Sequence, residues 1–253
     1  MVWIVLIGSA FLAGAINTMA GGGTLLTFPA LQLFGGLLPV QANASSTISL
    51  VSGSLAGAWG YRRELGGSGL AWLRLLILPS VVGGAVGALL VSILPNTVFR
   101  AVLPWLLLTA AVLFLLQPLL ARWTRLEGAE GLPSTGGCVA AVFFQLVVAL
   151  YGGYFGAGIG ILMLTSLGVM GLGDIHRANA IKTLLAAAIN GVSVLVFVLA
   201  GTVVWWCVVP MTLGAIAGGY AGAAVGRRLP KVVVRWFVIS VAFALSGYYF
   251  VRG

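Results

Sequence analysis

The sequence predicts an all-α, polytopic membrane protein made of two inverted repeats with about five apolar segments each. Composition is the first observation: 61% of the 253 residues are hydrophobic and 7% are charged, whereas soluble domains carry about a quarter charged residues. Because backbone polar groups cannot stay unpaired in lipid, and because the period-2 alternation of a membrane barrel is absent, the apolar segments are expected to be helices.

An internal duplication is the second observation. Asn43 and Thr47, with alanines flanking the asparagine, return 136 positions later as Asn179 and Thr183. A longer pattern returns at an offset of 135, with identical internal spacing: Gly83-Gly84-x-x-Gly87, Pro95 and Arg100 match Gly218-Gly219-x-x-Gly222, Pro230 and Arg235. A duplicated, strongly apolar chain is typical of secondary transporters, whose halves move about a site at their interface.

Glycine, proline and charged residues divide each half into five apolar runs. In the first half the runs are 2–20, 24–37, 42–60, 71–93 and 97–120, and in the second they are 136–154, 159–171, 178–200, 204–226 and 231–251. A helix needs about 20 residues to cross the bilayer core. Between eight and ten crossings are therefore expected, and the first run is expected to remain in the mature protein.

The second run of each half is too short to cross the bilayer as a straight helix, since about 14 residues rise only about 20 Å. Each short run follows a glycine cluster, at 21–23 in the first half and at 152–160 in the second. Short, glycine-broken segments at corresponding places in two halves indicate the binding site of a transporter.

The boundaries follow from this division: a first transmembrane repeat at 1–121, a cytoplasmic linker at 122–135 and a second repeat at 136–253. Five passes per half invert the second repeat. With the N-terminus outside, every basic residue except Arg100 and Arg252 faces the cytoplasm, as the positive-inside rule favours. Whether the short runs cross fully or re-enter is left open.

The net charge of +9 comes from basic residues at the ends of apolar runs. Membrane lipid is therefore the expected partner, and nucleic acid is not. Cys138 and Cys207 match no metal or redox spacing and are interpreted as packing residues. No cofactor and no metal ion are expected, and the oligomeric state is not predicted. Aromatic residues near run ends are expected at the membrane interface, namely Trp59, Tyr61, Trp72, Trp205 and Trp206.

Polar residues shared by both repeats are the candidate binding residues, because polar side chains in hydrocarbon are costly. With exposed glycine amides, amide and hydroxyl groups could hold a small oxyanion without many full charges. The alternative is that they only cap or cross-link helices. The predicted substrate-binding residues are Asn17, Gly22, Gly23, Asn43, Ser46, Thr47, Gly158, Gly160, Asn179, Lys182, Thr183 and Asn190.

Lys182 has two interpretations of equal weight. It lies five residues after Arg177, about 7 Å by helical rise, so its side chain could extend to the cytoplasmic interface. It could instead supply the positive charge of an anion site. Asp174, His176 and Arg177 lie on the connector before this helix, where a solvated, salt-bridged turn is favoured over a gate or a proton relay.

No catalytic residue is predicted. Gly66-Gly67-Ser68-Gly69 resembles a pattern of intramembrane serine proteases, but it lies in a polar loop, and the single histidine lies on another connector. The sequence contains no Walker A motif and no metal-ligand cluster. An enzyme is therefore not expected.

Taken together, these segments resemble the TauE/SafE family of sulfite-exporter-like permeases over almost the whole chain. The resemblance is carried by Gly21-Gly22-Gly23-Thr24-Leu25-Leu26-Thr27-Phe28-Pro29-Ala30, Ala42-Asn43-Ala44-Ser45-Ser46-Thr47, Gly53 to Leu65, Gly152 to Gly160, and Asn179 to Gly191. It implies an inner-membrane permease for small organosulfur and related anions. Ile159 stands where related sequences often have glycine, which implies a site that is not strictly symmetric.

The expected function is transport of a small, anionic, organosulfur, sulfite-like or carboxylate solute across the bacterial inner membrane by alternating access. A passive anion channel is one alternative, and a non-transporting assembly partner of another membrane complex is a second. The substrate, the direction of transport and the coupling ion are not predicted.

Overall fold

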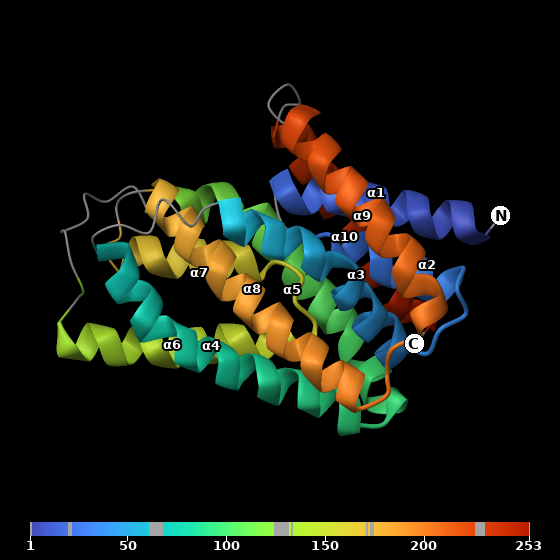
Figure 1. The fold of residues 1–253 in the computed structure, drawn as a ribbon, viewed down its shortest axis with the longest axis horizontal. Helices are drawn as coiled ribbons and strands as arrows, with labels where there is room; N and C mark the ends of the chain where they lie inside the picture. Colours follow the sequence, from blue (N-terminus) through green and yellow to red (C-terminus); the bar gives the residue numbers. More distant parts are fainter. Residues whose placement is uncertain are drawn as a thin grey trace.

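The computed structural model describes residues 2–19, 22–60, 68–123, 132, 134–170, 172, 175–225 and 231–252. Within these residues every regular element is a helix (Figure 1). The ten helices are α1 (Val2–Met19), α2 (Thr24–Leu33), α3 (Pro39–Gly60), α4 (Ser68–Ile93), α5 (Asn96–Trp123), α6 (Thr135–Tyr154), α7 (Ile159–Val169), α8 (Ile175–Leu199), α9 (Trp205–Val225) and α10 (Lys231–Arg252). The expected all-α architecture is confirmed.

Each predicted run corresponds to one helix, and the largest differences in their bounds have local causes. The run expected over 24–37 ends as a helix at Leu33, because Phe34 and Gly35 both donate their backbone N–H to the Ala30 carbonyl, and Gly36 then takes a φ of +67°. Such bonding with a left-handed glycine is how helices commonly terminate.

The next helix begins at Pro39, three residues earlier than expected. Proline suits the first turn of a helix, since it has no N–H to leave unpaired. The Gln41 side chain accepts a hydrogen bond from Leu38 N at 3.3 Å, and Asn96 Oδ1 accepts one from Val40 N at 3.2 Å. These two amides cap the helix start, which apolar patterning alone did not reveal.

The contacts between helices are reciprocal between the two halves of the chain. The first helix of each half packs along the fourth helix of the other, as α1 on α9 and α6 on α4 (Figure 1). In the same way α4 packs on α8 and α9 on α3, and α5 contacts α7 as α10 contacts α2. Apart from α3 with α5, each extensive contact has such a counterpart. The fourth helices therefore tie the halves together.

Glycines permit the close approach of these fourth helices. A methyl group at Gly83 would lie 2.6 Å from the carbonyl oxygen of Leu146 on α6, and one at Gly218 would overlap the carbonyl of Phe11 on α1. Gly218 lies 135 positions after Gly83, and Leu146 lies 135 positions after Phe11. The duplication in the sequence thus corresponds to a duplicated contact in space.

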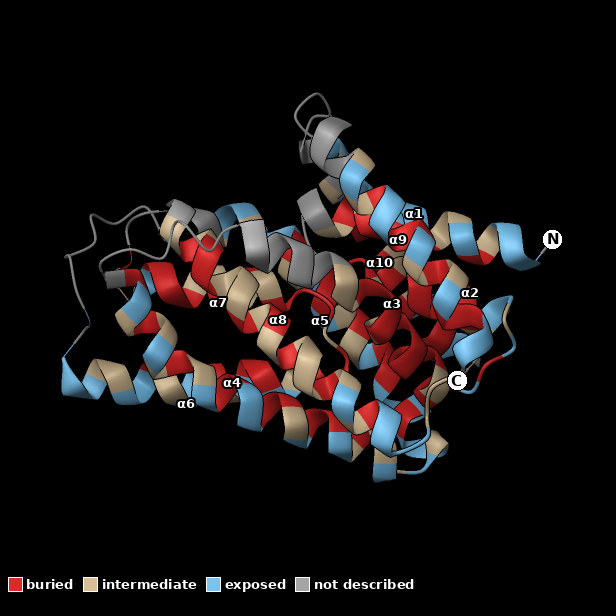
Figure 2. Cartoon of the chain, in the orientation of Figure 1, coloured by how far each residue is buried: buried red, intermediate tan, exposed pale blue. Residues whose placement is uncertain are grey.

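The apolar core has two parts. The larger part surrounds Phe28, Phe99, Phe114 and Phe155 and draws on both halves, whereas the smaller part surrounds Trp72 and joins α4, α6, α7 and α8. Figure 2 shows buried residues concentrated around α2 and α3, while α6 and the start of α1 expose much of their surface. Trp72 is fully buried, so its expected place at the membrane interface is wrong. Trp205 and Trp206 are exposed, as that position requires.

The outer surface is apolar. Exposed large side chains include Ile4 at 77%, Phe143 at 68% and Leu78 at 68% of their full area, which suits contact with lipid chains. In the part of the chain that the structure describes, four helices are long and apolar enough to cross a membrane: Gly69–Ile93, Asn96–Leu120, Thr135–Tyr154 and Arg177–Leu199. The chain is therefore a multi-pass membrane protein.

Candidate functional site

The second glycine cluster forms a sharp connection between α6 and α7. Gly156 and Gly158 both have a φ of +83°, which favours glycine over residues that carry a Cβ. The N–H groups of Phe155 and Gly156 both donate to the Tyr151 carbonyl, and the Tyr151 hydroxyl donates to the Ala157 carbonyl at 2.7 Å. This network fixes the direction in which α7 begins.

Lys182 of α8 lies against the start of α7. A methyl group at Gly160 would lie 3.4 Å from Lys182 Cδ and 3.8 Å from Nζ. These distances are ordinary van der Waals contacts, so the lysine side chain lies directly alongside this glycine. The first N–H groups of a helix have no partner within the helix, and its N-terminus carries a partial positive charge. A positive charge beside the positive end of a helix is unfavourable, and an anion between them would be attracted by both.

Asn43 of α3 lies at the other end of the same connection. It is 1% exposed, and its Nδ2 donates to the carbonyl of Tyr154, the last residue of α6, at 2.9 Å. This bond joins the first half of the chain to the second. Asn43 Oδ1 is buried and has no hydrogen-bond partner among the described residues.

The first glycine cluster is more closely packed. Gly22 has a φ of +94°, and a methyl group there would lie 2.7 Å from the ring of Phe114 on α5. A methyl group at Gly23 would lie 2.7 Å from the Ala13 carbonyl oxygen. Gly22 and Gly23 also accept the first backbone hydrogen bonds of α2. The glycines here allow α1, α2 and α5 to approach one another.

Ser46 occupies the position in the first half that Lys182 occupies in the second, 136 residues apart. Its Oγ lies 2.5 Å from Thr27 Oγ1, and both side chains are fully buried. The first half therefore has two hydrogen-bonded hydroxyl groups where the second half has a positively charged lysine. Sequence reasoning missed Thr27, although a polar residue inside a short apolar helix was a usable signal.

Thr47 and Thr183 make the same local contact. Each hydroxyl donates to the carbonyl four residues earlier, at 2.9 Å to Asn43 O and 2.7 Å to Asn179 O. A hydroxyl has one proton, so in this arrangement each threonine offers a solute only acceptor oxygens. The back-bonding agrees with the alternative interpretation of these residues as internal helix contacts.

Three other predicted site residues are partly buried asparagines. Asn17 lies in the last turn of α1, Asn179 near the start of α8, and Asn190 eight residues beyond Lys182, about 12 Å along the helix axis. Their participation in a site stays a prediction. The linker segment 124–131, Asp174 and the basic pair Arg227-Arg228 lie outside the described residues, so the predictions that involve them are not tested.

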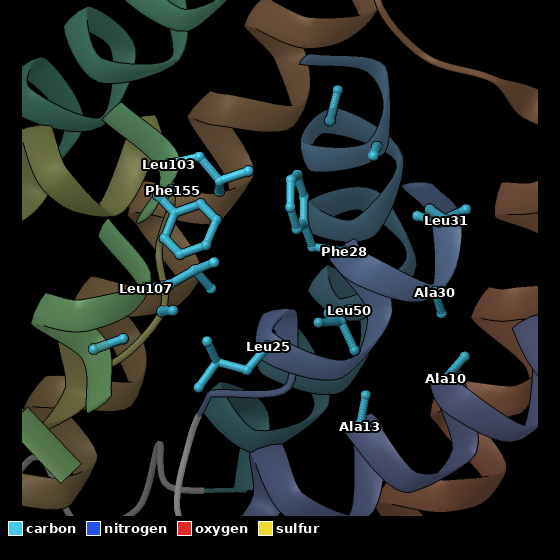
Figure 3. Close-up of a cluster of buried hydrophobic side chains, with 14 of the residues drawn as sticks. Ala10, Ala13, Leu25, Phe28, Ala30, Leu31, Leu50, Leu103, Leu107 and Phe155 are labelled. Carbon is cyan, nitrogen blue, oxygen red and sulfur yellow. The ribbon is translucent and has the colours of Figure 1, made fainter. Parts of the chain in front are cut away.

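Apolar side chains fill the space between α2 and the second glycine connection. In Figure 3, Phe28 faces Phe155, Leu103 and Leu107. The Phe28 and Phe155 rings are 5.7 Å apart and close to perpendicular, at 80°, a favourable arrangement for two aromatic rings. All four side chains are at most 2% exposed. We call them the central apolar cluster.

Comparisons with known proteins identify a family and several bacterial relatives. The family model described as "Sulfite exporter TauE/SafE" matches residues 6–249. The "Probable membrane transporter protein YfcA" of Escherichia coli K12 is 31% identical over 242 residues, covering 94% of this chain and 86% of the relative. The "Probable membrane transporter protein ORF9" of Sinorhizobium sp. is 30% identical over 239 residues, covering 94% and 88%. A "Probable membrane transporter protein" of Haemophilus influenzae is 27% identical over 242 residues, covering 94% and 90%. No solved structure matches this chain.

Proposed function

Because this chain belongs to the sulfite exporter TauE/SafE family, a family of membrane transporters, we propose that it carries a small anionic solute across the bacterial inner membrane by alternating access. The solute is a sulfur-containing oxyanion, a sulfonate or a small carboxylate. The family description and the printed names of the relatives support transport and bacterial membranes. The sulfur-containing solutes are suggested by the family description, while the chemistry of the site supports only the negative charge of the solute.

The placement of Lys182 against the start of α7 is the observation that carries the proposal. A cation and a helix N-terminus are both attractive to an anion, and the helix end alone contributes about 0.3–1 kcal/mol at an exposed site and up to about 2 kcal/mol when partly buried. Gly160 leaves the backbone of α7 uncovered on the side of the lysine. In this site the ammonium of Lys182 and the N–H groups around Gly158 and Gly160 bind the anionic oxygens.

The remaining site residues bring both halves to the solute. Asn43 reaches the second half through its bond to Tyr154, and Ser46 and Thr47 follow it on the same helix. Asn179, Thr183 and Asn190 share α8 with Lys182, while Gly22, Gly23 and Asn17 lie at the junction of α1 and α2. In this proposal the asparagines and threonines line the path on which the solute moves as the halves rock, while Ser46, Gly22 and Gly23 hold α2 against its neighbouring helices.

Inverted repeats supply the mechanism of alternating access. The proposed repeats are 1–121 and 136–253, joined by a cytoplasmic linker at 122–135. Reciprocal contacts of the fourth helices and the matched pairs Gly83–Leu146 and Gly218–Phe11 support two halves with the same internal plan. Two such halves in opposite orientation have two equivalent packings, one open to each side of the membrane. Eight to ten crossings follow if the short helices α2 and α7 cross or re-enter.

A carrier is favoured over the two alternatives. A passive anion channel needs a continuous polar path, whereas the central apolar cluster separates α2 from the second glycine connection in this conformation. A non-transporting assembly partner has no need of a lysine placed at a helix N-terminus beside a glycine.

A flux assay in proteoliposomes tests the proposal, with sulfite, thiosulfate and simple sulfonates as solutes and with and without a pH gradient. A carrier gives saturable uptake, and unlabelled solute inside the vesicles accelerates uptake of labelled solute by counterflow. Uptake that rises linearly with concentration and shows no counterflow would establish the channel instead. Absence of flux for every anion, with the protein folded and inserted, would favour the assembly partner.

A further inference from the structure

The amide oxygen of Asn43 is a buried hydrogen-bond acceptor without a partner in the described part of the chain. The other end of the amide is fixed, since Nδ2 donates to the Tyr154 carbonyl at 2.9 Å. Turning the amide over would place two acceptor oxygens against each other, because a carbonyl oxygen cannot donate. The side chain therefore presents an acceptor, and not a donor, to whatever lies beside it.

Neighbouring polar groups on α3 are paired, which sets Asn43 apart. Ser45 Oγ accepts from Val204 N at 3.1 Å, Ser49 Oγ donates to the Ser45 carbonyl at 2.8 Å, and Ser46 pairs with Thr27. Among the described side chains of α3, Ser52 Oγ is also buried without a partner. It lies nine residues from Asn43, on the opposite side of the helix, so it belongs to different surroundings.

An unpaired acceptor is costly in an apolar interior, and most buried polar groups in proteins find a partner. Asn43 bears this cost at a specific place. Its partner Tyr154 begins the six-residue step to Gly160, and Lys182 lies against Gly160. The acceptor of the first half and the cation of the second half thus lie at the two ends of one short segment that leads into α7.

We propose that Asn43 Oδ1 accepts a hydrogen bond from the transported solute and that the protein thereby selects anions that also carry an O–H or N–H group. Such solutes are hydroxy- or amino-substituted sulfonates and carboxylates, or oxyanions that keep one proton. The proposal rests on the function proposed above and narrows its solute class. In it, Lys182 and the start of α7 bind the anionic group, while Asn43 recognises the donor.

Matched solutes test the selection directly in proteoliposomes that contain the full chain. The pairs are 2-hydroxyethanesulfonate with ethanesulfonate, and hydroxyacetate with acetate; each pair differs by one hydroxyl. The parent protein is expected to transport the hydroxylated member about ten- to a hundredfold more efficiently, measured as maximal rate divided by apparent KM. Asn43→Leu is expected to bring this ratio close to one while the protein still transports the unsubstituted member.

Gln145→Leu is the matched control. Gln145 is also a buried amide, at 2% exposed, and its Nε2 donates to Ser80 Oγ at 2.8 Å between α4 and α6. The substitution removes a contact between helices, but Asn43 Oδ1 remains available to accept the solute's hydrogen bond. The variant is expected to alter both members of a pair alike and to keep the ratio of the parent.

The outcomes separate this inference from the proposed function. Efficient, saturable transport of both members at equal efficiency by the parent overturns the selection and leaves the proposed carrier function intact, whatever the stability of Asn43→Leu. Absence of saturable flux for any anion overturns both. A loss in Asn43→Leu that is equal for both solutes and is relieved by raised sodium would assign the oxygen to a cation, and would likewise overturn the inference.

Discussion

At the scale of single residues, Ser46 and Lys182 occupy equivalent positions in the two halves but carry different chemical groups, a hydroxyl in the first half and a cation in the second. Both follow an Asn-Ala pair at the same spacing on corresponding helices. Ser46 Oγ is hydrogen-bonded to Thr27 Oγ1 at 2.5 Å, whereas Lys182 lies beside Gly160. One duplicated position therefore stabilises the contact between α2 and α3, and in our proposal the other binds the solute.

Replacement of Lys182 tests this assignment. Lys182→Ala is expected to raise the apparent KM for transport about ten- to a hundredfold, because one charge-assisted contact in a partly desolvated site contributes about 1.5–3 kcal/mol. Lys182→Arg is expected to restore transport only in part, since a planar guanidinium does not replace a compact ammonium. Flux is measured at matched protein abundance in proteoliposomes.

Arg74→Ala is the control for this measurement, since Arg74 is an exposed cation on α4. It should leave the apparent KM near that of the parent. If Lys182→Ala transports with an unchanged apparent KM, the side chain only extends to the interface, and the anion site then depends on the glycine amides and the Asn/Thr pairs.

At the scale of helices, glycines decide which pairs lie in close contact. Gly87 of α4 faces the backbone of α6 at Leu150 and Tyr154, and Gly153 of α6 faces the backbone of α4 at Gly84. Since backbone atoms cannot move away as a flexible side chain can, a methyl group at these positions forces the helices apart. Helix contacts in membranes depend on such packing of small residues.

Gly87→Ala is expected to destabilise the protein by about 1–3 kcal/mol, the usual cost of overpacking a well-filled contact. Gly191→Ala on α8 is the matched control, because a methyl group there meets no atom within 4 Å; its better helix propensity should give equal or slightly higher stability. The thermal unfolding temperature in one detergent compares the two. Equal temperatures for both variants would contradict the close packing of α4 on α6.

Phe28, a member of the central apolar cluster, gives a second prediction at this scale. Phe28 of α2 contacts Phe99, Phe155 and Tyr249, with ring centroids 6.1, 5.7 and 6.4 Å away. Phe28→Ala removes a buried aromatic side chain and should cost about 3–5 kcal/mol. Phe143→Ala on α6 deletes an aromatic ring that is 68% exposed, so its unfolding temperature should stay near that of the parent. An equal fall in the unfolding temperature of both variants would contradict the burial of Phe28 in the core.

At the scale of the whole molecule, each half is completed by a helix of the other. The fourth helices α4 and α9 pack on the first and third helices of the opposite half, so neither half can bury its apolar surfaces alone. This exchange gives the rocking motion of the proposal a structural basis: the surfaces that must slide are those lined by glycines such as Gly83 and Gly218.

The inverted arrangement predicts the sides on which the loops lie. On a background without Cys138 and Cys207, Thr124→Cys in the linker should resist an impermeant thiol reagent added outside cells and react once the membrane is opened. A cysteine appended before Val2 should react from outside, because the positive-inside rule predicts an external N-terminus for this distribution of basic residues. Reaction of Thr124→Cys with the external reagent in intact cells would contradict the inverted-repeat model.

The sequence alone determined the membrane class, the ten helices and their equivalence between halves, because apolar runs and glycine breaks are local features and the duplication repeats them. It did not determine that Trp72 is buried, that α2 ends at Leu33, or that Thr27 meets Ser46. It also left Lys182 undecided. Only the tertiary structure brings Lys182 to Gly160 and Asn43 to Tyr154. These contacts join helices far apart in the chain, and their partners depend on how the helices pack, which local apolar patterning does not encode.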